Sequence, residues 1–184
     1  EPAIVDKWAR AKMALLSGAD LVLELPVAFS CASAELFAYG AVRALHYTGV
    51  VDCLSFGSEQ GELGSLWRIA SVLYEEPAAY RELLKKHLSE GNSFAAAREK
   101  ALTGYLRGLP DNIMSQSNNI LAIEYLKALK SLRSNIQPTT IKRQGSSYME
   151  TEIAASFSSA TAIRAFLQNN GSPEHPLLFA NLPE

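Results

Sequence analysis

The chain is poor in cysteine, and its two cysteines lie in no metal-binding pattern. Cys31 and Cys53 are the only ones among 184 residues, and they form no CxxC motif or cysteine–histidine cluster. This excludes a cysteine-based zinc site and fits a reducing, cytoplasmic setting. Only three histidines are present, and none has a partner at the spacing of a metal site or a catalytic triad, so no protein-bound metal is predicted.

Long apolar runs and a large excess of one charge are missing as well. The longest apolar stretches are much shorter than the roughly 20 residues that a membrane span needs, and no signal peptide is visible, so no membrane association is expected. A net charge of −2 argues against a wholly basic nucleic-acid binder. The chain is 48% hydrophobic, which is the balance of a soluble globular domain with a sizeable core.

The order of strand and helix patterns predicts an α/β protein with a mainly parallel sheet. Strands are expected at 21–25, 50–56 and 136–143, and the second has the near-continuous apolar character of a sheet buried on both faces. Helices are expected at 6–17, 34–48, 63–75, 78–89, 94–107, 118–132 and 159–169. The stretch 61–110 is therefore predicted to be an all-helical insertion.

The most distinctive motif opens the last of these helices, where residues 158–164 read Ser-Ser-Ala-Thr-Ala-Ile-Arg. A helix N-terminus offers unpaired N–H groups and a partial positive charge, which together favour anions. Ser159 and Thr161 add hydroxyl donors, and Arg164 is able to fork onto phosphate oxygens. The motif fits a triphosphate-binding site, and it fits equally well an ordinary Ser-capped helix with a surface arginine.

Two further candidates follow the second and third predicted strands, where α/β proteins bind ligands. Residues 56–59 read Phe-Gly-Ser-Glu, and Gly57 lets a ligand approach the backbone closely because it has no Cβ. Residues 142–148 combine two cations, a glycine, two hydroxyls and an aromatic ring, which suits a nucleotide phosphate or an RNA backbone. The alternatives are a simple turn at the first position and a solvated basic loop at the second.

A fourth candidate is the run Ser-Gln-Ser-Asn-Asn at residues 115–119, at the start of a predicted helix. Ser117 is a favourable N-cap. The amides of Asn118 and Asn119 are suited to read the polar edge of a base. Helix capping alone is the alternative explanation of this run.

These stretches together resemble the HIGH-type nucleotidylyltransferase superfamily, and more specifically the bacterial tRNA(Met) cytidine acetate ligase family. The Ser-x-Thr-x-x-Arg element at 159–164 resembles that of the superfamily, and the supporting stretches are 1–10, 23–26, 56–59, 117–121 and 142–146. The resemblance implies a Rossmann-like sheet of the nucleotidylyltransferase type with a helical insertion. The implied domains are a nucleotide-binding domain at 1–60 and 111–171, the insertion at 61–110, and the start of a C-terminal region at 172–184.

The resemblance also implies an activity, the ATP-dependent acetylation of the wobble cytidine of elongator tRNA(Met). Acetate attacks the α-phosphate of ATP to give acetyl-adenylate and pyrophosphate, and the cytidine N4 amine then takes the acetyl group. Mg²⁺ is the expected counter-ion of the triphosphate. The residues implied to contact ATP are Gly57, Asn118 and Arg143, and those implied to hold its β- and γ-phosphates are Ser159, Thr161 and Arg164.

One element of the family is missing from the sequence. The family carries His-x-Gly-His near its N-terminus, where it stabilises the transition state at the α-phosphate, and its layout would place that element before Glu1. We therefore expect this chain to be the middle of a longer enzyme, without its catalytic residues and inactive alone. The alternatives are a small-molecule adenylyltransferase of the same superfamily and a non-catalytic RNA- or nucleotide-binding module.

Overall fold

A computed structural model describes residues 3–110, 112–144, 158–169, 171–172 and 174–180. The chain divides into two compact units. The larger unit is Leu25–Arg143, and the smaller unit combines Glu1–Glu24 with Gln144–Glu184. The domain boundaries implied by the resemblance stay a prediction.

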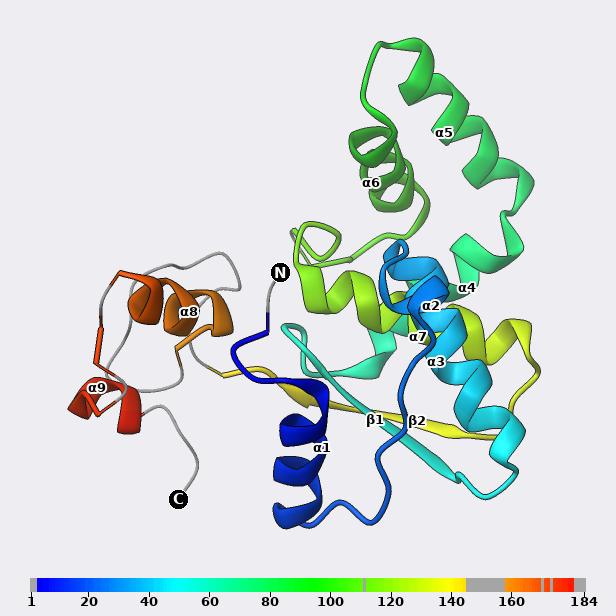
Figure 1. The fold of residues 1–184 in the computed structure, drawn as a ribbon. Coiled ribbons are helices and arrows are strands. Elements are labelled where there is room, and N and C mark those ends of the chain that lie inside the picture. Colours follow the sequence, from blue (N-terminus) through cyan, green and yellow to red (C-terminus); the bar gives the residue numbers. More distant parts are fainter. Residues whose placement is uncertain (1–2, 111, 145–157, 170, 173, 181–184) are drawn as a thin grey trace. The chain divides into compact units, whose positions relative to one another are not determined.

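The larger unit holds both described strands and most of the helices (Figure 1). Its elements in chain order are α2 (Val27–Ser30), α3 (Ala34–Thr48), β1 (Cys53–Ser58), α4 (Leu63–Glu75), α5 (Ala78–Ser89), α6 (Phe94–Tyr105), α7 (Ser117–Ser131) and β2 (Gln137–Lys142). The two strands are parallel neighbours, with Ser58 opposite Lys142. Since parallel neighbours need a crossover, the chain leaves β1 and returns to β2 through four helices. This confirms the α/β class and the parallel pairing.

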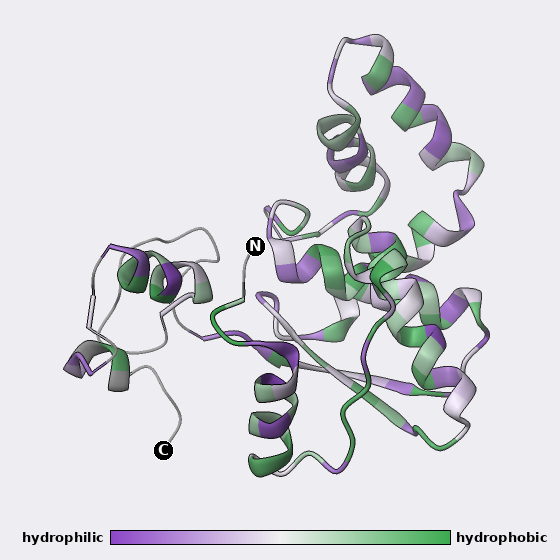
Figure 2. Ribbon diagram, in the orientation of Figure 1, coloured by the Kyte–Doolittle hydropathy of each residue, from purple (hydrophilic) through white to green (hydrophobic). Residues whose placement is uncertain are grey.

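The core of the larger unit lies among α3, α4 and α7. Val42 of α3, Leu66 and Ile69 of α4, and Ile123 and Leu126 of α7 are all buried, and they belong to one continuous apolar cluster. Removing such side chains from water is the main favourable contribution to folding. Along α5, by contrast, polar and apolar bands alternate (Figure 2), because this helix buries only one face, at Tyr80.

One face of β1 packs on this core and the other is exposed. Phe56 lies on the packed face, where its ring centroid is 5.5 Å from that of Tyr125 in α7. Cys53, Ser55 and Gly57 alternate with the packed residues and are exposed. The prediction of a strand buried on both faces is therefore wrong for β1, because the apolar cluster of the larger unit covers only the face that carries Leu54 and Phe56.

Helix ends were the most predictable feature of the larger unit. α3, α4 and α5 begin and end at the predicted residues, and α3 stops at Gly49, whose φ of +70° is a left-handed conformation that glycine adopts without strain.

The predicted strand at 21–25 is wrong. The two described strands pair with each other, and residues 21–25 join neither. A strand requires a hydrogen-bonding partner, which its own sequence pattern does not supply.

The smaller unit contains α1 (Lys7–Leu16), α8 (Ala160–Gln168) and the short α9 (Pro176–Phe179). α1 begins where Asp6 accepts a hydrogen bond from the Ala9 N–H at 2.8 Å, which satisfies one of the orphan donors of a helix start. α8 begins in the same way at Ser159. Within the described ranges, no helix combines the length and the apolar character that crossing a membrane requires.

Candidate functional site

Three of the predicted site residues come together where β1 and β2 end. Gly57 lies in β1, Arg143 directly follows β2, and the Arg143 N–H donates to the Ser58 carbonyl at 2.8 Å. The N-terminus of α7 meets the same edge, because Glu59 bonds to Asn118. We call Gly57, Glu59, Asn118 and Arg143 the strand-end cluster.

The carboxylate of Glu59 caps α7 from a distant part of the sequence. Its Oε1 accepts from the Asn118 backbone N–H at 3.2 Å and from Asn118 Nδ2 at 2.7 Å, and its Oε2 accepts from the Asn119 N–H at 2.8 Å. Burial alone would raise the pKa of Glu59, but the hydrogen bonds from the Asn118 side chain and from backbone N–H groups outweigh it and leave that pKa lowered. The group is therefore an anion at neutral pH.

This cap corrects the prediction that Ser117 caps the helix. Ser117 is the first helical residue, the N-cap position belongs to Gln116, and the Gln116 side chain caps no backbone N–H of the helix. Asn119, predicted as a possible reader of a base, is fully buried and structural. Its Oδ1 accepts from the Gln60 N–H at 2.9 Å, and its Nδ2 donates to Gln116 Oε1 at 2.7 Å.

Hydrogen bonds and close packing against β2 fix the turn that carries Glu59. Ser58 is fully buried, and its hydroxyl lies 2.8 Å from Thr140 Oγ1 and accepts from the Gly61 N–H at 2.9 Å. Gly61 has a φ of +72°, and a Cβ there would stand 2.5 Å from the Cβ of Lys142. Only glycine fits this position, which closes the turn against β2.

Above Gly57 the strand is open. Apart from Gly57 and its two chain neighbours, no atom of the described residues lies within 4 Å of the place where a Cβ would stand, and the residue is exposed. Asn118 and Arg143 are half-buried at the same edge. The strand-end cluster therefore offers a bare stretch of backbone, an amide and a guanidinium to a ligand.

The other predicted residues lie on α8, in the smaller unit, and we call Ser159, Thr161 and Arg164 the α8 cluster. Ser159 is buried, and its Oγ accepts from the Ala162 N–H at 2.9 Å. Arg164 Nη2 donates to Thr161 Oγ1 at 3.4 Å. Arg164 also lines a cavity of about 220 Å³ with Ala3, Ile4, Leu167 and Gln168.

The structure thus confirms a serine-capped helix start for the α8 motif, with Ser159 as the N-cap and Ala160, one residue later than predicted, as the first helical residue. A neutral hydroxyl holds this N-terminus, whereas a carboxylate holds that of α7. Of the basic stretch at 142–148, residues 145–148 lie outside the described residues. In the described part of the chain, no group of three or more His, Cys, Asp or Glu side chains is placed to hold a metal ion.

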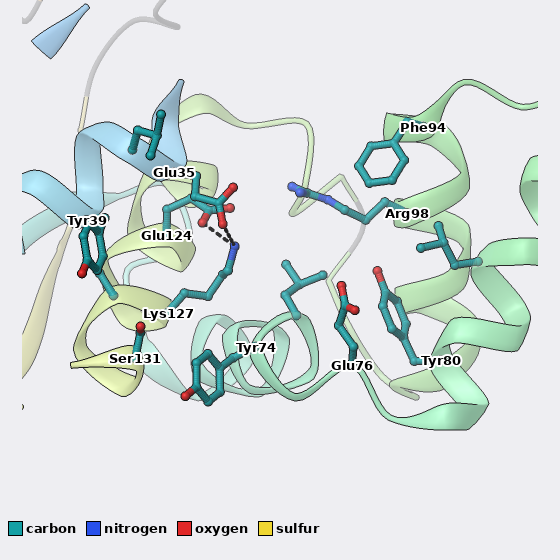
Figure 3. A pocket seen from close by; sticks show the side chains of 14 residues that line it. Glu35, Tyr39, Tyr74, Glu76, Tyr80, Phe94, Arg98, Glu124, Lys127 and Ser131 are labelled. Carbon is teal, nitrogen blue, oxygen red and sulfur yellow. Dashed lines mark hydrogen bonds and ion pairs between the residues drawn. The ribbon is translucent and has the colours of Figure 1, made fainter. Parts of the chain in front are cut away.

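A separate cavity of about 540 Å³ opens in the larger unit, between α3, α4 and α7 on one side and α5 and α6 on the other (Figure 3). Lys127 points into it and bonds to Glu124 at 2.7 Å and to Glu35 at 3.0 Å. Arg98 and Tyr80 face these groups from the other wall (Figure 3). None of the lining residues is a predicted site residue, so this cavity is distinct from the strand-end cluster.

Comparison with known proteins yields both a family and close relatives. The profile of the HIGH Nucleotidyl Transferase family matches residues 1–184. A protein of Thermoanaerobacter sp. (strain X514) named tRNA(Met) cytidine acetate ligase is 52% identical over 172 residues, which cover 93% of this chain and 43% of the relative. A protein of Clostridium tetani with the same name is 46% identical over 188 residues, covering 100% of this chain and 46% of the relative.

Solved structures agree with these relatives. Apo TmcAL of Thermotoga maritima matches with a TM-score of 0.90 at 41% identity, over 100% of this chain and 44% of the other. TmcAL of the same organism bound with alpha-thio ATP matches with a TM-score of 0.83 at 41% identity, over 100% of this chain and 42% of the other. The chain therefore spans less than half the length of these relatives.

Proposed function

Since the chain belongs to the HIGH nucleotidyl transferase family, we propose that it is part of an ATP-dependent tRNA(Met) cytidine acetate ligase. The observation that carries this proposal is the 52% identity, over 93% of the chain, to a relative with that name. The alpha-thio ATP bound by a structural neighbour supports ATP as the nucleotide.

The proposed reaction has two steps. A carboxylate oxygen of acetate attacks the α-phosphorus of ATP, and the bond to the β-phosphate breaks, which gives acetyl-adenylate and pyrophosphate. The N4 amine of the wobble cytidine in elongator tRNA(Met) then attacks the acetyl carbonyl carbon. AMP leaves with the electron pair of the broken carbon–oxygen bond, and the amine loses one proton.

In this proposal the strand-end cluster receives the nucleotide. Gly57 lets it approach the backbone because the space above its Cα is open. Asn118 contributes an amide at the N-terminus of α7, and Arg143 contributes a guanidinium at the end of β2. Backbone and amide hydrogen bonds bind and orient a ligand without taking part in the chemical step.

The α8 cluster is proposed to hold the β- and γ-phosphates. Its helix N-terminus, the hydroxyls of Ser159 and Thr161, and the guanidinium of Arg164 are all groups that favour phosphate oxygens. Mg²⁺ enters as the counter-ion of the triphosphate. Phosphate oxygens and water are its usual ligands, so the proposal assigns it no cluster of protein side chains.

The test is exchange of radiolabelled pyrophosphate into ATP by the full-length protein, with and without acetate. Exchange that depends on acetate is the expected result, because acetyl-adenylate formation is reversible while pyrophosphate is present. Exchange that needs a different acid would indicate a small-molecule adenylyltransferase. ATP binding without any exchange would indicate a nucleotide-binding module.

Transfer to RNA is tested separately with labelled acetate. The label should move to elongator tRNA(Met), and it should not move to a transcript in which uridine replaces the wobble cytidine, because uridine has no N4 amine. Equal labelling of both transcripts would contradict the proposed acceptor.

A further inference from the structure

Glu59 determines which way the Asn118 amide faces. Its Oε1 accepts from both the backbone N–H and the side-chain Nδ2 of Asn118, at 3.2 and 2.7 Å. An ionised carboxylate has no hydrogen to donate, so only the NH₂ end of an amide forms this bond. The carbonyl oxygen of Asn118 is thereby turned away from Glu59.

The conditions for this orientation are built into the turn. The lowered pKa of Glu59 keeps it ionised at neutral pH, since the hydrogen bonds it accepts outweigh the effect of burial. The neighbouring Asn119 is fully buried and bonded at both ends of its amide. The first turn of α7 is therefore fixed relative to β1, and Asn118 is fixed with it.

Asn118 is half-buried, and no partner of its Oδ1 occurs among the hydrogen bonds of the described residues. This oxygen is an acceptor with two lone pairs. It lies at the same strand end as Gly57, where the backbone is open. A ligand at this edge accordingly meets a hydrogen-bond acceptor with a fixed position.

We propose that Glu59 is a positioning residue that presents the Asn118 carbonyl oxygen to the nucleotide, so that the site selects a hydrogen-bond donor on the ligand. The inference rests on the proposed function, in which Asn118 contacts ATP. The nucleoside part of ATP carries two kinds of donor, the exocyclic amino group of adenine and the ribose hydroxyls. Both would be recognised by the same oxygen.

The experiment measures nucleotide affinities of the full-length protein by titration calorimetry. The ligands are ATP, inosine triphosphate, 2′-deoxy-ATP and 3′-deoxy-ATP. Inosine replaces the amino group by a carbonyl acceptor, and each deoxy analogue lacks one hydroxyl. The wild type should bind ATP about fivefold or more tightly than at least one analogue, the loss that one hydrogen bond accounts for.

The decisive variant is Glu59→Gln. Glutamine has one acceptor oxygen where the carboxylate has two, so it cannot keep the bonds of both Oε1 and Oε2. When that oxygen accepts from the Asn119 N–H, the NH₂ end takes the place of Oε1, faces the Asn118 side chain and favours the reversed amide. The preference for ATP over the selected analogue should then fall to within about twofold. If the amino group is the donor, the preference over inosine triphosphate should invert, because the reversed amide donates to the inosine carbonyl.

Glu62→Gln is the matched control. Glu62 caps α4 by accepting from the Gly64 and Ser65 N–H groups at 2.7 and 3.2 Å, and none of these bonds involves Asn118. This variant should weaken a helix cap in the same way, by replacing a carboxylate with an amide, and leave the ratio of ATP to analogue affinity unchanged.

The possible results distinguish a failure of the inference from a failure of the proposed function. If Glu59→Gln weakens all four nucleotides by one common factor, or none of them, Glu59 has only a structural role and the inference is wrong, while ATP binding by the wild type upholds the proposed function. A wild type that binds ATP and all three analogues equally overturns the inference even if the variant does not fold. A wild type that binds no ATP overturns both.

Discussion

Replacing Lys127 by methionine should destabilise the larger unit far more than the loss of a surface ion pair would. Lys127 Nζ bonds to Glu124 at 2.7 Å and to Glu35 at 3.0 Å (Figure 3). The two carboxylates differ in environment, because the Glu124 side chain is 5% exposed and that of Glu35 is 68% exposed. Methionine keeps the apolar length of the lysine and removes only its charge and its donors.

The expected magnitude follows from these exposures. The pair with the exposed Glu35 accounts for at most about 1 kcal/mol. Removing the partner of a buried charge costs about 3–5 kcal/mol, because the remaining charge stays desolvated without compensation. We therefore expect a loss of about 3 kcal/mol in the free energy of unfolding. At an m value of about 2 kcal/mol/M, this lowers the urea midpoint by about 1.5 M.

Lys130→Met is the matched control, one turn further along the same helix. Lys130 bonds to Glu75, whose side chain is 55% exposed, so its loss should cost no more than about 1 kcal/mol. The assay is urea denaturation followed by circular dichroism. Equal midpoints for the two variants would refute the reasoning, since the predicted difference depends entirely on the burial of Glu124.

Three further predictions concern the candidate site. Gly57→Ala should leave the melting temperature unchanged, because no atom lies near the added Cβ, and should weaken ATP binding in calorimetry; unchanged ATP affinity would remove Gly57 from the site. Arg164→Ala should weaken ATP binding about tenfold or more, as expected for a charge-assisted contact, and weaken tRNA binding less; an equal loss for both would contradict a dedicated triphosphate role. The wild type should have a larger free energy of unfolding than Glu59→Gln above pH 4.5, and this difference should shrink as the pH falls below 4.5, because folding lowers the pKa of Glu59 from 4.5. A difference that grows on acidification in denaturation curves would contradict this prediction.

The parts of the fold that depend on neighbouring residues were predictable from the sequence. α4 ends at the expected residue, before Pro77, and α3 stops at Gly49, where the backbone turns left-handed. Proline and glycine act through their own φ angles and backbone donors, so their effect is visible without any knowledge of the tertiary structure.

Features that depend on a distant partner were not predictable. The apolar run at 21–25 has the composition of a strand, and yet Leu21 and Leu23 are 70% and 51% exposed and pair with neither described strand. Serine is a residue type that often caps helices, and yet it is Glu59, 59 residues before Asn118, that accepts the hydrogen bonds of the first N–H groups of α7. A local pattern identifies which residues are suited to a role, and only the fold decides which of them reaches it.

The caps of α7 and α8 differ in charge, and this difference decides which ligand group each helix N-terminus favours. The N-terminus of α7 already holds the negative charge of Glu59, so a phosphate placed there would meet a like charge at short range, which is unfavourable. The N-terminus of α8 is capped by the neutral hydroxyl of Ser159, so its partial positive charge is not cancelled by its cap. A neutral nucleoside suits the first and a triphosphate suits the second. The charge of each cap, taken within its own unit, therefore supports the proposed assignment of Asn118 to the nucleoside and of Thr161 and Arg164 to the phosphates.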